Sequence, residues 1–596
     1  MFAQRLDELR RIMLKAGAEA FLLPRSDKYL NEDLAPADER LHWLCGFTGS
    51  QGLLAVVPDG AALLVDGRYS VQAQRECAGW LEVMELDDDE LFAWLEHRLP
   101  AGAHLLADAE LHSVAQWRTW ERLAAERGWH LRASRENPVD ACWLDRPEAA
   151  ASPVFAQALK WSGEPCANKL QRLAALLSDQ SCDSLWLPAP DMLAWILNVR
   201  ANDIAIAPLP FSCGVLYADG ALDWFIDERR LALPESWLPE SVRVLPPAWT
   251  GRLGELLQQR GTRSIWVDEG TCNAATFAML RSSLGELHLA THPLPLLRAC
   301  KNEIELAGSH AAHQRDGLAL CRFLHDFETR PANYESGDEF TVVDSLDGWR
   351  RRDATYRGVS FDTIAACGAN GAQPHYLPKA GQAAPLGQGE LLLIDSGGQY
   401  PEGTTDVTRV VALGSITSRQ RRLYTQVLRA HIALACCRFP RGTSGQQLDV
   451  VARQVMWQAG LDYAHGTGHG VGSYLHVHEG PHRIAPHASP VALRPGMITS
   501  IEPGLYLEGE LGIRLENLYE VVECPRYPGF LCFQSLTLAP FEPALIDPGQ
   551  LSTSDLAWLE SYQQEVCRRL VPDLEPEVAA WLRGKIVPTE QSAART

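Results

Sequence analysis

The chain has 596 residues, which is too long for one hydrophobic core and predicts several domains. Its hydrophobic fraction of 46% and charged fraction of 22% are typical of a soluble globular protein. A formal net charge of −21 repels phosphate groups, so we expect no general affinity for nucleic acid or for an anionic lipid surface.

An amphipathic helix is predicted at the start of the chain, because Leu6, Leu9, Ile12 and Met13 recur at helical spacing. Charged residues interrupt this stretch every few positions, so it predicts neither a secretory signal nor a membrane span. No later stretch reaches about 18 uninterrupted apolar residues, so we expect no membrane span elsewhere.

The first segment continues with strand-like runs at 20–24, 53–57 and 61–66. The turn-forming triplet Pro58-Asp59-Gly60 predicts a hairpin between the last two runs. Strands that alternate with helices up to about residue 143 are typical of an α/β domain.

A second segment resembles the first and predicts a duplicated domain. Residues 184–200 (SLWLPAPDMLAWILNVR) repeat the pattern of the first strand and of RLHWLCGFTGS (40–50), with Trp43 and Trp195 in similar places. Each segment then contains a strand pair joined by a turn, VVPDGAALLVDGR in one and LYADGALDWFID in the other. The helix signals end near Asp145, which marks the predicted boundary.

The third segment begins with a predicted long helix from about residue 301 to 328, and the preceding HPLPLL (292–297) is predicted to be a linker. After Asp547 the chain reads as helices, with apolar side chains at helical spacing. The fifteen cysteines include no C-x-x-C pair, which predicts free thiols in a reducing cytosol.

A pair of acidic residues gives the first chemical signal. The run LLLIDSGGQYPEGTTDVTRVV (391–411) reads as a strand that ends at Asp395 and a second strand that begins at Asp406. A hairpin of this kind can bring both carboxylates to one point. The alternative is that both residues merely form turns, which Asp favours at strand ends.

The second signal is the histidine- and glycine-rich run HGTGHGVG (465–472). Glycine lets the backbone approach a ligand closely and leaves room for the two imidazoles. The alternative is a glycine-rich loop with incidental histidines. A dinucleotide-binding loop is disfavoured, because Val471 stands where the third glycine of that motif belongs.

The third signal is a second pair of acidic residues, Glu502 at the end of an apolar run and Glu516 in the strand-like LENLYEVV. A carboxylate that is buried in an apolar strand needs a counter-charge. The alternative is that these are surface glutamates on edge strands. Together the signals offer four carboxylates and one imidazole, which suits harder divalent ions such as manganese. Carboxylates can bridge, so such a set can hold two ions for hydrolysis.

These motifs resemble the pita-bread metallopeptidase family, which includes methionine aminopeptidase, prolidase, aminopeptidase P and creatinase. The match is closest to the three-domain cytosolic aminopeptidase P group, in HGTGHGVGSYLHVHEGP (465–481), IEPG (501–504), GIRLEN (512–517) and the tail LTLAPFEP with WLESYQ. GFTGSQGLLAV and VDGRY resemble the family's creatinase-like N-terminal domain.

The resemblance implies a multidomain α/β and α+β chain. It implies two creatinase-like α/β domains at 1–145 and 146–297, a pita-bread catalytic domain at 298–546, and a helical extension at 547–596 that packs on the catalytic domain.

The resemblance also implies roles for five metal ligands. Asp395 would chelate one ion, Asp406 and Glu516 would bridge both, and His469 and Glu502 would complete the second ion. A hydroxide between the ions would attack the carbonyl before proline, and Glu502 would shuttle the proton. The implied ions are two divalent cations, preferably Mn²⁺, with Zn²⁺ or Co²⁺ as alternatives.

Four further residues match family positions near the substrate. His375, His465 and His478 would contact the substrate or its developing oxyanion, and Arg514 would support the ligands. The alternative for His375 and His465 is an ordinary loop histidine.

The expected activity is release of the N-terminal residue from peptides with proline in second place. Proline lacks an amide hydrogen and has a fixed ring, so most peptidases do not cleave these bonds. The resemblance further implies a cytoplasmic homodimer without nucleic-acid or membrane partners. Two alternatives stay open: a prolidase that acts on X-Pro dipeptides, and a pita-bread binding module without catalysis. The duplicated N-terminal half and long tail favour the aminopeptidase, and the five intact ligands disfavour the binding module.

Overall fold

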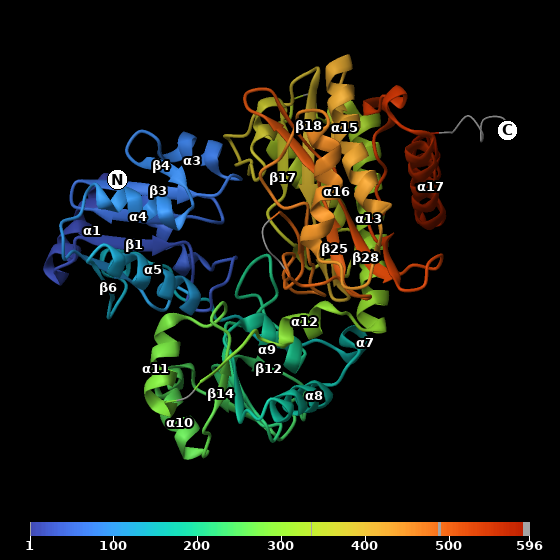
Figure 1. Ribbon diagram of the computed structural model, residues 1–596. Coiled ribbons are helices and arrows are strands. Elements are labelled where there is room, and N and C mark those ends of the chain that lie inside the picture. Colours follow the sequence, from blue (N-terminus) through green and yellow to red (C-terminus); the bar gives the residue numbers. More distant parts are fainter. Residues whose placement is uncertain (1, 286, 335, 487–489, 588–596) are drawn as a thin grey trace. The chain divides into compact units, whose positions relative to one another are not determined.

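The structure is a computed structural model that describes residues 2–285, 287–334, 336–486 and 490–587 (Figure 1). The chain forms two compact units. The first contains Met1–Leu159 and Glu164–Leu294, and the second contains Lys160–Gly163 and Pro295–Thr596. All candidate ligands therefore belong to the second unit.

The first unit contains two six-stranded sheets, of which the first has the order β4-β3-β2-β1-β5-β6. Strand β2 pairs antiparallel with β1 and β3, whereas the β3–β4, β1–β5 and β5–β6 pairs are parallel. The predicted hairpin joins β2 to β3. The strands are β1 (Ala20–Pro24), β2 (Leu53–Val57), β3 (Gly60–Val65), β4 (Glu82–Glu85), β5 (His104–Ala107) and β6 (His130–Ala133).

Helices cover both faces of this sheet. Successive side chains of a strand point to opposite faces, so each strand contributes apolar side chains to two layers. Phe21 and Leu23 of β1 pack with Leu6, Leu9 and Met13 of the first helix, as its spacing predicts. The alternate residues of β1 pack against α4 and α5 on the other face. The helices of this part are α1 (Phe2–Ala16), α2 (Arg40–Cys45), α3 (Ser70–Cys77), α4 (Asp88–Glu96), α5 (Val114–Glu126) and α6 (Pro138–Cys142).

The second sheet has the order β13-β11-β10-β8-β14-β15 and repeats the pairing directions of the first, strand for strand. Trp43 in α2 and Trp195 in α9 both lie on a helix between the first two strands of their sheets. The predicted duplication is confirmed. The strands are β8 (Ser184–Leu187), β10 (Cys213–Tyr217), β11 (Leu222–Phe225), β13 (Val242–Leu245), β14 (Ile265–Val267) and β15 (His288–Leu289).

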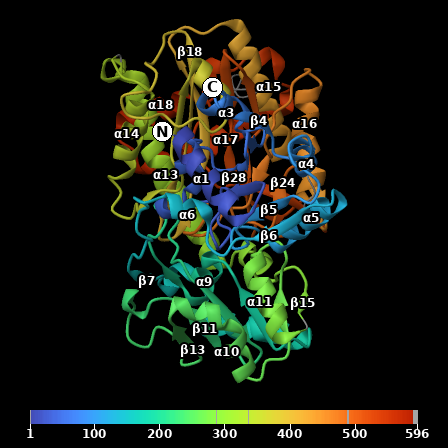
Figure 2. The ribbon, with the colours of Figure 1, turned by 90° about the vertical axis from the view of Figure 1, so that its left-hand side faces the viewer.

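Helices α10 and α11 pack on the second sheet (Figure 2). Their apolar side chains share one buried core with Trp186 and Val215. The helices of this part are α7 (Leu159–Ser162), α8 (Cys166–Asp179), α9 (Pro190–Leu197), α10 (Leu253–Gln259) and α11 (Ala274–Leu284). A small sheet has the order β12-β7-β9, with β7 (Val154–Ala156), β9 (Val199–Arg200) and β12 (Leu231–Ala232).

The predicted linker at 292–297 is wrong in part, because Leu294–Ala299 forms helix α12. Pro295 is the second residue of this helix, where a backbone N–H has no helical partner and its loss costs little. The predicted long helix is confirmed as α13 (Glu303–Thr329), and Asn302 and Glu305 form a capping box at its start.

A three-stranded antiparallel sheet, β17-β18-β21, forms a central layer of the second unit. Leu392 and Ile394 of β18 pack against α13 and α14 on one face. Leu391 and Leu393 pack with α15 and α16 on the other face. The elements are β17 (Ile364–Cys367), β18 (Glu390–Ser396), β21 (Val407–Leu413), α14 (Glu339–Arg350), α15 (Ser418–Ala435) and α16 (Gly445–Trp457).

A second sheet of this unit has the order β22-β29-β28-β25, and the short strands form a three-stranded sheet, β16-β19-β20, and two strand pairs, β23–β24 and β26–β27. The sheet strands are β22 (Arg438–Pro440), β25 (Ile498–Ile501), β28 (Asn517–Glu523) and β29 (Phe530–Ser535). The short strands are β16 (Gly358–Val359), β19 (Gly398–Tyr400), β20 (Gly403–Thr404), β23 (Gly468–His469), β24 (Arg483–Ile484), β26 (Gly504–Leu507) and β27 (Leu511–Arg514).

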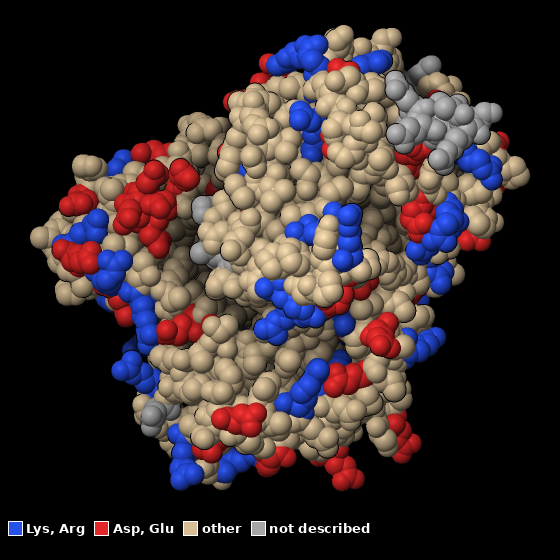
Figure 3. Space-filling model, turned by 45° about the vertical axis from the view of Figure 1, so that its right-hand side comes forward, with Lys and Arg blue, Asp and Glu red and all other residues tan. Residues whose placement is uncertain are grey.

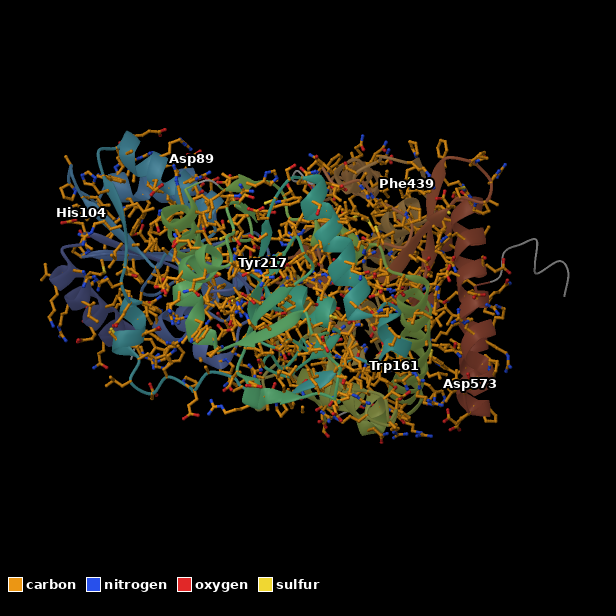
Figure 4. The ribbon with its side chains drawn as sticks, turned by 90° about the horizontal axis from the view of Figure 1, so that it is seen from below. Asp89, His104, Trp161, Tyr217, Phe439 and Asp573 are labelled. Carbon is orange, nitrogen blue, oxygen red and sulfur yellow. The ribbon has the colours of Figure 1, made fainter. Side chains whose placement is uncertain are left out.

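The end of the chain forms α17 (Thr553–Leu570) and α18 (Pro576–Gly584), which confirms the predicted helices. Leu559 and Tyr562 of α17 are buried. Asp573, labelled in Figure 4, lies between these helices and accepts hydrogen bonds from Gln314 and Arg322 of α13 at 3.2 and 3.0 Å. The C-terminal helices therefore pack on the second unit.

Membrane-spanning helices and the state of the cysteines concern the chain as a whole. No helix among the described residues has the length and the apolar character that a membrane crossing requires. All fifteen cysteines are free thiols, as predicted. On the face drawn in Figure 3, acidic and basic side chains are interspersed.

Candidate metal centre

The register of the β18–β21 pair places two of the predicted ligands on one face of the sheet. Asp395 lies opposite Thr408, and residues that face each other across an antiparallel pair point to the same side. Asp406 lies two residues before Thr408 and shares its side. The carboxylates of Asp395 and Asp406 are both buried. The hairpin that the sequence predicts is therefore confirmed.

Glu516 joins this pair from the segment between β27 and β28. Its N–H donates to the carbonyl of Thr408 at 3.2 Å, and its carboxylate accepts a hydrogen bond from the Thr408 hydroxyl at 2.8 Å. Glu516 is 2% exposed, which excludes the alternative of a surface glutamate on an edge strand.

His469 faces two carboxylates from β23. Its Nε2 lies 3.4 Å from Oδ2 of Asp406 and 3.5 Å from Oε1 of Glu502. Its Nδ1 lies 2.9 Å from the carbonyl of Gly470, to which an Nδ1–H donates. This tautomer leaves the Nε2 lone pair directed at the carboxylates, as a metal ligand requires. The hydroxyl of Ser500 donates to Glu502 at 3.1 Å and accepts from the N–H of His469 at 2.9 Å.

Glycines in the His469 loop are needed for close backbone contacts. A side chain at Gly468 would overlap the carbonyl of Ser500, and one at Gly470 would overlap the carbonyl of Glu479. The structure therefore explains why HGTGHGVG is rich in glycine: the loop lies directly on its neighbours.

The cluster has the features of a site for divalent cations. Ligand atoms of Asp406, His469 and Glu516 all lie within 4.8 Å of one another. One oxygen on each of Asp395, Asp406 and Glu516 is buried without a hydrogen-bond partner among the described residues. Buried polar atoms of this kind are normally satisfied, so these oxygens fit the coordination of a cation.

The electrostatics of the carboxylates support the same conclusion. Burial, together with the charges of Asp406 and Glu502 and against the opposing charge of Arg514, raises the pKa of Asp395 to about 6. Burial and the neighbouring carboxylates also raise the pKa of Glu516 well above its usual value. Divalent cations would offset this repulsion, and hard oxygen ligands suit them.

Arg514 connects the ligands to a further tyrosine. Its guanidinium donates to Asp395, to the hydroxyl of Thr408 at 3.2 Å and to the hydroxyl of Tyr506 at 2.7 Å. The Tyr506 hydroxyl also lies 2.8 Å from Nε2 of His465. A hydrogen-bonded row therefore runs from His465 to Asp395, and Nδ1 of His465 lies 2.7 Å from the Gly466 carbonyl. A role of His465 in substrate binding stays a prediction.

Sequence reasoning did not identify Tyr506, Thr408 or Ser500. Burial raises the pKa of Tyr506 to about 12, so its hydroxyl keeps its proton near neutral pH. The register of β26 with β27 places Tyr506 opposite Gly512, two residues from Arg514. Only the hairpin pattern of GLYLEGELGIR could have indicated this pairing.

His478 and His375 occupy different surroundings. The ring of His478 lies 4.4 Å from the ring of His469, edge to face. His375 follows η5 (Gly368–Ala372), which packs against β26 and β27. Glu339 holds this loop by accepting from Tyr376 and the N–H of Ala384 at 2.7 and 2.9 Å. Whether His375 reaches a substrate stays a prediction.

Comparison with known families agrees with this architecture. The sequence pattern of metallopeptidase family M24 matches residues 308–523, and that of the C-terminal region of peptidase M24 matches 529–589. The patterns of creatinase/prolidase N-terminal domains match 5–129 and 145–305. The expected fold class, two creatinase-like domains and a pita-bread domain, is therefore confirmed.

Individual relatives match over nearly the whole chain. Aminopeptidase P1 of Lotus japonicus is 33% identical, over 98% of this chain and 99% of the relative. Xaa-Pro aminopeptidase 2 of Rattus norvegicus is also 33% identical, over 99% of this chain and 90% of the relative. The crystal structure of the X-prolyl aminopeptidase of Caenorhabditis elegans, a cytosolic enzyme with a di-nuclear active site, matches with a TM-score of 0.93 at 29% identity and covers 99% of this chain and all of that one. With these matches and the buried ligand cluster, the chain belongs to the aminopeptidase P group of metallopeptidase family M24.

Proposed function

We propose that the chain is a metal-dependent Xaa-Pro aminopeptidase, which releases the N-terminal residue from peptides with proline in second place. The observation that carries the proposal is the convergence of Asp406, His469 and Glu516 in a chain that matches Xaa-Pro aminopeptidases over its full length. The roles given below to individual residues are part of the proposal.

The proposed cofactor is a pair of divalent ions, with Mn²⁺ preferred and Zn²⁺ or Co²⁺ as alternatives. Asp395 would hold one ion, His469 and Glu502 the other, and Asp406 and Glu516 both. The orphaned oxygens of Asp395, Asp406 and Glu516 fit this arrangement. When bound, such a pair supplies an activated water and polarises the scissile carbonyl.

Residues of the chain would then handle the proton and the developing charge. Glu502 is the proposed proton carrier: its side chain is 17% exposed, so a substrate can reach it, and Ser500 fixes one of its oxygens. His478, beside His469, is the proposed donor to the oxyanion, and His375 and His465 are proposed to contact the peptide. Arg514 would hold Asp395 in its ligating position.

Individual carboxylate oxygens of the site suit a free amino terminus. Four carboxylates converge here, and Arg514 offers Asp395 a counter-charge. Two divalent ions would balance the charge of all four carboxylates, so an ammonium group, which an exopeptidase has to recognise, would be held by single carboxylate oxygens and not by a net negative charge. Proline removes an amide hydrogen from the substrate, so the pocket needs no acceptor for it.

Peptide assays would test the proposal against its two alternatives. The purified chain would be loaded with Mn²⁺ and given an X-Pro dipeptide, an X-Pro-containing tetrapeptide and the same tetrapeptide with alanine in place of proline. We expect cleavage of the tetrapeptide with proline at the first bond. Cleavage confined to dipeptides would establish a prolidase, and no cleavage with Mn²⁺, Zn²⁺ or Co²⁺ would establish a binding module.

The proposal includes a cytoplasmic homodimer and the domain limits 1–145, 146–297, 298–546 and 547–596. The fifteen free thiols and the cytosolic relative from Caenorhabditis elegans support the location. Sedimentation of the purified chain at micromolar concentration would test the dimer, and a monomer at all concentrations would refute it.

A further inference from the structure

The second unit contains a buried arginine, Arg409, whose guanidinium joins three separate segments of chain. Arg409 is the second residue after Val407 in β21 and is 3% exposed. Its side chain leaves the sheet on the face opposite to Asp406 and Thr408, because alternate residues of a strand point to opposite sides. The Arg409 side chain therefore lies on the face of β21 that points away from the candidate ligands.

The first set of contacts of Arg409 holds the strand that follows Asp406 next to the backbone of Glu516. Its Nη1 donates to the carbonyl of Thr408 at 2.8 Å and to the carbonyl of Glu516 at 2.6 Å. Its Nη2 donates to the side chain of Asn517, the residue after Glu516, at 2.7 Å. One rigid planar group thus fixes the strand that follows Asp406 against the segment that contains Glu516.

The second set of contacts reaches the C-terminal helices. Nη2 of Arg409 donates to the hydroxyl of Tyr562 in α17 at 3.1 Å and to the carbonyl of Ala539 at 2.8 Å, and Nε donates to the carbonyl of Pro540 at 3.0 Å. The Tyr562 hydroxyl in turn lies 2.8 Å from the carbonyl of Ala539, to which it donates. The ring of Phe541 lies 4.3 Å from the guanidinium carbon.

These contacts satisfy a buried cation without a carboxylate. Among the described residues, the hydrogen-bond partners of Arg409 are carbonyls, one amide and the Tyr562 hydroxyl. The two N–H groups of Nη2 share three acceptors, so loss of the Tyr562 hydroxyl would leave both N–H groups bonded and would remove only the contact that ties the guanidinium to α17. A guanidinium released from α17 would be free to shift, together with the carbonyl of Glu516 that the same group holds.

We propose that Arg409 and Tyr562 are positioning residues for the metal centre, through which the C-terminal helix α17 sets the spacing between Asp406 and Glu516. The inference rests on the proposed function, because it assigns both carboxylates to the same ions. Metal ligands have to be held to within about half an ångström, so a small shift of Glu516 would weaken the binding of both proposed ions. Helix α17 would thereby act on the proposed metal centre through Arg409, without contacting the ligands themselves.

The test compares two variants of α17. Tyr562→Phe removes the hydroxyl that Arg409 uses and keeps the buried ring. Gln563→Leu is the matched control, because Gln563 is equally buried and bonds to the backbone of Phe541 and Lys585 but not to Arg409. The full-length proteins would be titrated with Mn²⁺ by calorimetry, and kcat and KM would be measured on an X-Pro tetrapeptide.

We expect Tyr562→Phe to weaken Mn²⁺ binding about tenfold and to lower kcat with KM within about twofold, as for other residues that orient metal ligands. Gln563→Leu should lower the melting temperature and leave both the Mn²⁺ affinity and kcat within about twofold. Arg409→Lys, which keeps the charge but not the planar fork, should weaken Mn²⁺ binding further than Tyr562→Phe if it folds.

Two results would overturn the inference: unchanged Mn²⁺ affinity and kcat in Tyr562→Phe, or equal losses in Gln563→Leu, which would show a general effect of helix stability. The unmodified chain distinguishes this failure from failure of the proposed function. If it binds Mn²⁺ and cleaves the tetrapeptide, the proposed function stands whatever the variants do. If it does neither, the proposed function fails first.

Discussion

The carboxylates of the candidate metal centre repel one another, and hydrogen bonds from neighbouring side chains hold them in place. Burial raises the pKa of Asp395 and Glu516, whereas Arg514 lowers that of Asp395. Taking several carboxylates out of water next to one another is unfavourable unless cations join them. Thr408, Ser500 and Arg514 fix some of the carboxylate oxygens, and the remaining ones are free to ligate.

Asp406→Ala should remove both ions and nearly all activity, because this carboxylate is proposed to hold both of them. We expect less than about 1% of the activity of the unmodified chain, since a residue that binds a metal directly contributes more than the 10- to 100-fold typical of residues that only orient the ligands. Metal analysis of the dialysed protein would check it, with Asp59→Ala in an exposed turn as the control. Two ions retained per Asp406→Ala chain would contradict the assignment.

His478→Ala should keep the metal and lose turnover. The ring of His478 contacts that of His469 edge to face but takes no proposed ligand position. Loss of a positioned proton donor lowers rates about 100-fold or more. Metal analysis and kcat would be measured on the same sample. A fall in metal content in step with kcat would instead make His478 a ligand.

At the level of secondary-structure elements, the candidate ligands lie at strand ends and in short connections, not on long helices. The proposed ligands arise at the ends of β18, β21, β23 and β25 and between β27 and β28. Two glycines allow η5 and β27 to lie in direct backbone contact, because a side chain at Gly512 would overlap the carbonyl of Gly371. This contact places the loop with His375 against the strand with Arg514.

Gly512→Ala should therefore separate η5 from β27 and lower kcat/KM by about 100-fold, which is the cost of a misplacement near 1 Å. Gly348→Ala is the control, since Gly348 is an exposed position of α14 where no atom lies near an added methyl group, and alanine favours a helix by about 1 kcal/mol. Steady-state kinetics and circular dichroism would be compared. Full activity in a folded Gly512→Ala protein would show that the contact does not position the site.

The whole molecule combines a duplicated α/β unit with a separate unit that contains the proposed site. The two six-stranded sheets share strand order and pairing directions although their sequences agree only loosely. Each sheet is covered by helices and has its own apolar core. The stability of the first unit can therefore be changed at positions that are remote in sequence from the metal ligands.

Acid should destabilise the first unit through His112. Burial lowers the pKa of His112 from 6.5 to about 4, and its Nδ1 lies 3.0 Å from Gln116. The folded state therefore stays unprotonated while the unfolded chain gains a proton below about pH 6.5. Stability is then lost as pH falls from 6.5 toward 4, by about 2 kcal/mol at pH 5 from this group.

Urea unfolding at pH 7 and pH 5, followed by pulsed hydrogen exchange of peptides from α5, would measure this loss. His112→Phe removes the titrating group and should reduce the difference between the two pH values by about 2 kcal/mol. The exposed His97→Gln is the control and should leave the difference unchanged. An unchanged difference in His112→Phe would refute this origin of acid sensitivity.

Much of the fold followed from local patterns. The strands at 20–24 and 53–57 coincide with β1 and β2, and the long helix begins and ends within two residues of its predicted limits. The linker at 292–297 was wrong in part because proline disfavours a helix only beyond its first turn. The predicted hairpin between Asp395 and Asp406 is confirmed. Two apolar runs that are joined by a Gly- and Pro-rich connection, with an acidic residue at each end of that connection, have few other ways to fold.

By itself, the sequence determined which residues are candidate ligands, their order along the chain, the α/β duplication and the resemblance to aminopeptidase P, because each depends on local composition or on motifs. The tertiary structure alone decided that Glu516 lies against Thr408 and that Tyr506 joins His465 to Arg514. It also decided that Arg409 links the backbone of Thr408 and Glu516 to α17. These contacts join residues far apart in the chain. Strand register and side-chain packing create them, and no local spacing specifies either one.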